Sequence, residues 1–195
     1  MMTPLLSKPQ DFQLDTLLGY RIFGKHFRSR LPSQTTIILC PPAKQNMDYF
    51  LNDPLFRWRK WLFLGFDVLL FDPLGCGDSW GTVDWGGTED QETLNLIFKH
   101  LEPEQKKIVI LSFGLSTLTM LKIGNPHPLM AFEPLLKPEE IIQSHPELQR
   151  KPEHFWIERS LPENFAPDFP ILSTSRSCLR SRIRREKMLL EILLH

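Results

Sequence analysis

A serine in a sharp turn is the residue of this sequence best placed for covalent chemistry. Gly114-Leu115-Ser116 follows the apolar run Ile108–Phe113 and opens an apolar segment of helical character, Ser116–Ile123. A strand, a Gly-x-Ser turn and a helix favour a nucleophile, because the turn lifts the hydroxyl out of the sheet and the helix N-terminus faces developing negative charge. We therefore interpret Ser116 as a candidate nucleophile for acyl transfer.

A second loop, Asp72–Gly81, carries three glycines at the end of another apolar run. Its GxGxxxG spacing is a poor relative of a dinucleotide-binding fingerprint, because no helix starts directly there. The chain has no GxxxxGK[ST] phosphate loop, and Cys40, Cys76 and Cys178 have no metal-ligand spacing. We therefore expect no cofactor and no metal ion.

The elements that would position these loops alternate along the chain. Five short apolar runs bounded by breakers are predicted to be strands: Thr35–Cys40, Phe66–Phe71, Ile108–Phe113, Leu129–Phe132 and, with the weakest pattern, Ile171–Ser175. Helical patterns cover Leu55–Leu64, Thr88–Leu101 and Ser116–Ile123. This alternation predicts an α/β fold, a three-layer sandwich with a mostly parallel central sheet. Both loops then lie at the carboxyl ends of strands, where such sheets bind ligands.

Other segments complete a single domain covering residues 1–195. Residues 12–29 are expected to form a hairpin at one edge of the sheet, and residues 135–169 a cap-like excursion with short helices. Thr88 and Gln91 form a capping-box pattern at the start of a helix. The chain ends in an apparent helix, about residues 179–194, whose basic residues we expect in water rather than on an anionic membrane or nucleic acid.

The composition limits location and partners. Lys+Arg and Asp+Glu number 23 each, so the net charge favours neither nucleic acid nor a membrane surface. The sequence shows no signal peptide and no apolar stretch long enough for an integral membrane segment. Three cysteines without a disulfide pattern suit a reducing compartment, so we predict a cytoplasmic protein. A sheet edge left exposed would favour a homodimer.

The two loops together resemble the α/β-hydrolase superfamily, in which one strand ends D-x-x-G-x-G-x-S and the following strand carries the nucleophile. Asp72-Pro-Leu-Gly-Cys-Gly-Asp-Ser79 matches the first pattern, and the resemblance covers about residues 35–134. Cys40-Pro41-Pro42-Ala43 and Leu74–Ser79 look most like hydrolase-like proteins associated with bacterial exosortase systems, and less like type II thioesterases. The resemblance implies an α/β-hydrolase-like fold lacking its usual last strand, and hydrolysis of an ester or thioester of a small-molecule acyl substrate.

Carried over position by position, the resemblance implies Ser116 as the nucleophile. It also implies an oxyanion hole made by the N–H groups of Ala43, or Lys44 in its place, and Thr117. Glu133, directly after the strand Leu129–Phe132, would supply the acid, with Asp168 as the fallback. A base must come from the six histidines, which are His26, His100, His127, His145, His154 and His195. Of these, His154 is the candidate for folding over Ser116, and His145 is a less plausible one.

Three departures from the family pattern keep an alternative open. Leu118 stands where the second glycine of the turn is expected, and no histidine-bearing loop follows a final strand. Moving the alignment by two residues makes Ser112-Phe113-Gly114-Leu115-Ser116 the turn, so that Gly114 replaces the nucleophile. The alternative function is an inactive pseudo-hydrolase that serves as a binding or scaffolding module. Ser116 would then be an ordinary helix N-cap, and Glu133 and His154 surface residues.

Overall fold

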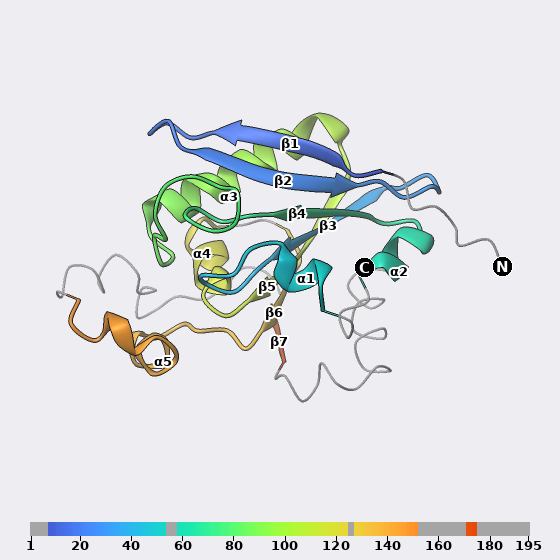
Figure 1. Cartoon of the computed structure of the whole chain (residues 1–195). Helices are drawn as coiled ribbons and strands as arrows, with labels where there is room; N and C mark the ends of the chain where they lie inside the picture. Colours follow the sequence, from blue (N-terminus) through green and yellow to red (C-terminus); the bar gives the residue numbers. More distant parts are fainter. Residues whose placement is uncertain (1–7, 54–57, 125–126, 152–170, 175–195) are drawn as a thin grey trace.

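One seven-stranded sheet organises the chain (Figure 1), whose computed structural model describes residues 8–53, 58–124, 127–151 and the backbone of 171–174. The strands are β1 (Gln10–Asp15), β2 (Arg21–Phe27), β3 (Thr35–Cys40), β4 (Asp67–Phe71), β5 (Lys107–Phe113), β6 (Leu129–Phe132) and β7 (Ile171–Thr174). Their order across the sheet is β1-β2-β4-β3-β5-β6-β7. The pairs β1–β2 and β2–β4 are antiparallel, and the other four pairs are parallel.

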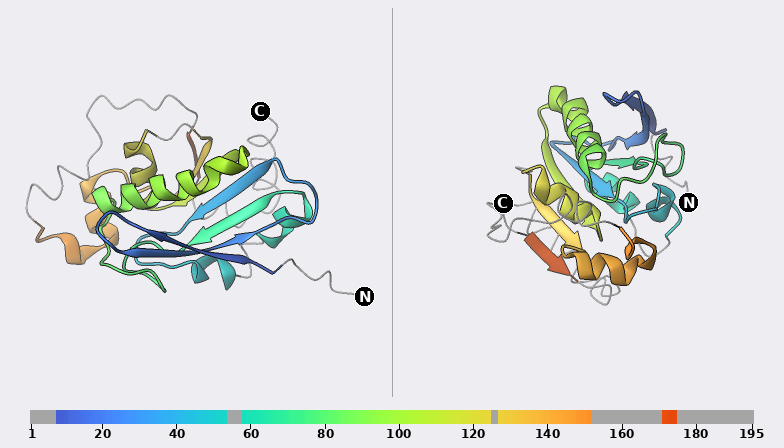
Figure 2. Two further views of the ribbon diagram at one scale, coloured as in Figure 1. Left: turned by 90° about the horizontal axis from the view of Figure 1, so that it is seen from above. Right: turned by 90° about the vertical axis from the view of Figure 1, so that its left-hand side faces the viewer.

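Helices cover both faces of the sheet, so each central strand is buried on two sides (Figure 2). Ile37 and Leu39 of β3 pack in one core with residues of α1 (Asp48–Leu51) and α2 (Arg59–Phe63). Ile38 and Cys40 point the other way, into a core with α3 (Thr88–Leu101) and α4 (Ser116–Lys122). This alternation explains why the strands read as continuous apolar runs, and it confirms the predicted three-layer α/β sandwich.

Most element bounds match those predicted from sequence. β3, β6 and α3 begin and end at the predicted residues, while β4 and β5 each shift their start by one residue. The described part of β7 begins at the predicted residue, Ile171. The predicted edge hairpin is β1–β2. The described part of α2 starts at Arg59, later than the predicted Leu55.

The capping box predicted at Thr88 is wrong. The N-cap of α3 is Gly87, and Thr88 is the first helical residue. The carboxylate of Asp84 accepts the N–H groups of Glu89 and Asp90 instead, and so satisfies the first turn from the preceding loop.

Two short helices follow β6: α5 (Pro138–Ser144) and the 3-10 turn η2 (Pro146–Leu148). Ile141 and Leu148 are buried in one cluster with Leu115 and Leu118 at the start of α4. Leu118 therefore has a packing role, because its side chain supports the α5–η2 segment. Residues 152–170, 175–195 and the predictions that fall on them (His154, Asp168, Cys178, His195 and the C-terminal helix) lie outside the described residues. None of the described helices combines the length and hydropathy needed to cross a bilayer.

Candidate active site

The turn between β5 and α4 is made by Gly114. Its φ is +59°, in the left-handed region that favours glycine. A Cβ at this position would lie 3.8 Å from both Leu135 Cδ1 and Pro42 Cβ, an ordinary contact distance. Position 114 thus has space for a side chain, and backbone conformation is what favours glycine there.

Ser116 is the first residue of α4, two residues after the turn. Its Oγ accepts the N–H of Phe113 at 3.0 Å and lies 2.9 Å from the carbonyl oxygen of Phe113 and 3.3 Å from that of Cys40, to either of which it can donate. None of these partners is a helix N–H, so the N-cap interpretation of Ser116 is wrong. The hydroxyl instead joins the carboxyl ends of β3 and β5.

A mostly apolar pocket lies over the carboxyl ends of β3, β4 and β5. The loops after β3 and β4 and the helices α3 and α4 line it, with Pro41, Pro42, Phe71, Leu74, Trp85, Leu94 and Leu115 as its main apolar side chains. Ser116, Thr93 and Thr119 add hydroxyl groups to the wall. Both loops singled out in the sequence therefore border one pocket. Its cavity of about 50 Å³ suits a short acyl chain rather than a drug-sized ligand, which needs roughly 300 Å³ or more.

The backbone N–H groups of Ala43 and Leu115 both border this pocket, and neither has a hydrogen-bond partner among the described residues. Ala43 was predicted as an oxyanion-hole donor. The other predicted donor, the N–H of Thr117, bonds to the carbonyl oxygen of Gly114 at 3.3 Å. Leu115 was not predicted, although the alternative alignment, in which Leu115 follows the nucleophile position, would have indicated it.

The loop Asp72–Gly81 supports the pocket. The carboxylate of Asp72 accepts the N–H groups of Met47 at 2.8 Å and Asp78 at 2.9 Å. Ser79 Oγ donates to the carbonyl oxygen of Asp72 and accepts the N–H of Phe23. Burial raises the pKa of Asp72, and the two N–H donors act in the opposite direction. The D-x-x-G-x-G-x-S pattern thus has a structural explanation here, which is to hold three segments together.

The predicted acid Glu133 lies away from the pocket, and the predicted base His154 lies outside the described residues. Glu133 follows β6 with a φ of +48°, is exposed and does not line the pocket. No described histidine lines the pocket. His145 contacts the pocket-lining Trp85, with 5.0 Å between the two ring centroids. Burial lowers the pKa of His145.

The cysteines beside the pocket are poor nucleophiles. Burial raises the pKa of the Cys76 thiol to about 11 and raises that of Cys40 further. Since the thiolate is the reactive form, neither side chain is activated.

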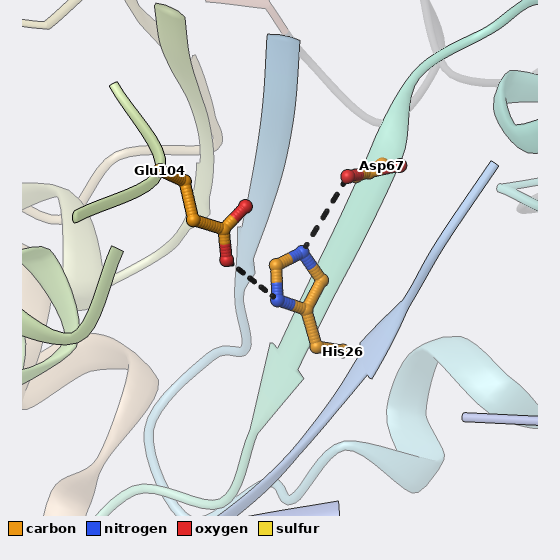
Figure 3. A group of neighbouring side chains, drawn as sticks. All are labelled: His26, Asp67 and Glu104. Carbon is orange, nitrogen blue, oxygen red and sulfur yellow. Dashed lines mark ion pairs between the residues drawn. The ribbon is translucent and has the colours of Figure 1, made fainter. Parts of the chain in front are cut away.

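A second group of ionisable side chains lies at the opposite end of the sheet, where β4 and β5 begin (Figure 3). His26 of β2 is 1% exposed, and neither ring nitrogen has a hydrogen-bond partner. Its Nδ1 lies 3.7 Å from Glu104 Oε1, in the 3-10 turn η1 (Glu102–Glu104), and its Nε2 lies 4.0 Å from Asp67 Oδ2. Burial, and then Arg28, lower the pKa of His26 to about 4.

The residue types of this group suit a divalent cation, but its charges do not. Arg28 forms ion pairs with both Asp67 and Glu104. Lys106 also pairs with both, at 2.7 Å from Asp67 and 3.3 Å from Glu104. Two cations thus balance two carboxylates around a neutral imidazole, and a divalent ion would add uncompensated charge in a buried place. Glu104 shows the strength of the pairing, because hydrogen bonds from Arg28 lower its pKa to about 2.

Comparison with solved structures identifies similar folds among esterases and serine hydrolases. An esterase from Pyrococcus furiosus is 18% identical, with 85% of this chain and 70% of that chain covered and a TM-score of 0.62. An alpha-beta serine hydrolase homologue from Coxiella burnetii is 16% identical, with 93% and 96% covered and a TM-score of 0.58. A serine hydrolase without a lid from Xanthomonas campestris is 14% identical, with 92% and 95% covered and a TM-score of 0.54.

The chain therefore has an α/β-hydrolase-like fold, as the resemblance in its loops implied. No protein-family model and no curated protein matches it. The finer likeness to proteins associated with exosortase systems stays a prediction, because sequence identities this low to solved structures establish only the fold.

Proposed function

We propose that this chain binds the acyl part of a small ester or thioester in the pocket and hydrolyses the bond with Ser116 as the nucleophile. The observation that carries the proposal is the position of Ser116 on the wall of an apolar pocket at the carboxyl ends of β3 and β5. The N–H of Phe113 donates to its Oγ, which favours negative charge on that oxygen.

The reaction would proceed in two stages. Ser116 Oγ rotates away from the carbonyl oxygens of Phe113 and Cys40, loses its proton to a base and attacks the acyl carbon. The N–H of Ala43, with that of Leu115 or Thr117, stabilises the oxyanion while the alcohol or thiol leaves with the proton. Water then hydrolyses the acyl-enzyme. We assign the base to His154 and the acid to Glu133 or Asp168, with residues 135–169 as a cap over the pocket.

A fluorophosphonate probe, with the modified residue located by mass spectrometry, tests this mechanism. We expect labelling at Ser116 that disappears in Ser116→Ala and falls strongly in His154→Ala, while Thr119→Ala, a hydroxyl on the same pocket, keeps it. Absence of labelling in folded wild-type protein would contradict the mechanism.

A second candidate is a non-catalytic acyl-binding module. The turn residue Gly114 and the backbone-bonded hydroxyl of Ser116 favour it, since the position that projects from the turn then carries no nucleophile. This candidate predicts that the wild type binds short acyl compounds without turnover. Gly114→Ser should fold, because a Cβ has space there and the left-handed backbone adds a cost of only about 1–2 kcal/mol. Any labelling that this variant gains should map to position 114.

A further inference from the structure

The mouth of the pocket carries an ion pair that links three segments of the chain. Lys44 follows β3, Trp85 precedes α3, and Glu147 belongs to η2. The ammonium of Lys44 lies 4.9 Å from the Trp85 ring centroid and pairs with the carboxylate of Glu147. Lys44 and Trp85 both line the pocket, whereas Glu147 reaches it from outside.

The backbone at this contact is strained. Lys44 has a φ of 62° and Trp85 a φ of 60°, both in the left-handed region that bulky residues rarely adopt. Only four non-glycine residues of the described chain share this conformation, and two of them are these contacting neighbours. Such strain persists where surrounding structure imposes it, and it gathers at ligand-binding sites.

Charge distinguishes Lys44 from the rest of the pocket. Asp90 is the other charged side chain among the described lining residues, and its carboxylate accepts the N–H of Gly86 at 2.7 Å. The side chains of Lys44 and Glu147 are 49% and 45% exposed. An ion pair this open to solvent is weak, so another anion can replace Glu147 at low cost.

From this arrangement we infer that Lys44 recognises a carboxylate or other anionic group on the ligand, and that Glu147 competes with the ligand for Lys44. The preferred ligand has a short apolar part that enters the pocket and one negative charge at its mouth. The inference rests on the proposed function for the placement of the acyl part, and it adds the charge of the ligand.

Binding measurements on the full chain test the inference without requiring turnover. Dissociation constants for hexanoate, hexyl phosphate and the neutral isostere hexanamide would be measured by ligand-observed NMR. The variants are Lys44→Gln and Glu147→Gln, with Lys25→Gln as the matched control. Lys25→Gln removes the same charge from a remote surface pair with Asp11.

We expect hexanoate to bind more tightly than hexanamide. Lys44→Gln should weaken hexanoate about fivefold and leave hexanamide unchanged, as loss of one partly exposed charge pair predicts. Glu147→Gln should tighten hexanoate, because the competitor is gone, and Lys25→Gln should change neither ligand. If Lys44→Gln weakens hexyl phosphate as much as hexanoate, Lys44 recognises negative charge in general. If it weakens hexyl phosphate much less, Lys44 prefers the carboxylate.

The opposite responses of the two variants make the inference falsifiable. It is overturned if hexanoate and hexanamide bind equally, if neither binds, or if Glu147→Gln weakens hexanoate as Lys44→Gln does. Melting temperatures of both variants establish that they are folded. Charge-dependent binding by a protein that no fluorophosphonate labels would remove the hydrolase mechanism and leave this inference standing.

Discussion

The carboxylate of Asp72 accepts the backbone N–H of Met47 at 2.8 Å, which joins the loop after β4 to the segment that follows β3. Its second oxygen accepts the N–H of Asp78. Asp72→Ala would leave both donors without a partner. Of the two bonds, only the one from Met47 is fully buried. An unsatisfied buried donor costs about 1–3 kcal/mol, so we expect the free energy of unfolding to fall by about that amount in urea denaturation.

Asp78→Ala is the control for this prediction, because the Asp78 side chain is exposed and only its backbone N–H contributes. It should change stability by less than about 0.5 kcal/mol. Equal losses in the two variants would mean that the carboxylate of Asp72 does not hold the loop.

Gly77 in the same loop should not tolerate a side chain. Its φ is +54°, and a Cβ would lie 2.1 Å from Asp72 Oδ2. Gly77→Ala should therefore lower the melting temperature far more than Gly19→Ala. Gly19 has a φ of +80° with no atom within 4 Å of a Cβ, so that change carries only the backbone cost of about 1–2 kcal/mol. Similar melting temperatures for both variants would contradict the predicted clash.

Stability should fall with acidification because of His26. Its pKa is lowered from 6.5 to about 4, so the unfolded chain binds a proton over this range that the folded protein does not. Above pH 6.5 the ring is neutral in both states, and the free energy of unfolding is unaffected by it. As the pH falls from 6.5 towards 4, protonation of His26 in the unfolded chain lowers this free energy. Below pH 4.5 the lowered pKa of Glu104 extends the loss towards pH 2.

His26→Leu should reduce the loss of unfolding free energy between pH 7 and pH 5 by about 2 kcal/mol. Guanidinium denaturation at the two pH values measures it. His100→Leu serves as a control. Burial lowers the pKa of His100 as well, but this side chain is only half-buried, so its removal should change the pH dependence less. An unchanged pH dependence in His26→Leu would show that another group is responsible.

Charge balance around His26 gives a prediction about zinc. Lys106 pairs with both Asp67 and Glu104, so Lys106→Met leaves one excess negative charge beside a histidine with unbonded nitrogens. Excess zinc should raise the melting temperature of Lys106→Met and leave that of the wild type unchanged. Stabilisation of the wild type by zinc would mean that the arginine and lysine pairs do not exclude the ion.

Much of the fold was predictable because its signals are local. β3 and β6 are continuous apolar runs bounded by proline and other breakers, and those features lie within a few residues of each other. The apolar stripe of α3 likewise predicted its end at Leu101, whereas its start at Thr88 was predicted from a capping box that does not form. Its cap was not predictable, because the carboxylate of Asp84 comes from the preceding loop and replaces the side chain of Thr88.

The sequence by itself determined the alternation of strands and helices, the two glycine-containing loops and their position at the carboxyl ends of strands. Only the tertiary structure decided that Gly114 takes the left-handed turn and that the hydroxyl of Ser116 lies against the carbonyl oxygen of Cys40, 76 residues away. It also decided that His26 lies between Asp67 and Glu104. These relationships depend on which strands are neighbours in the sheet. Here β3 lies between β4 and β5, although β4 lies between β3 and β5 along the chain.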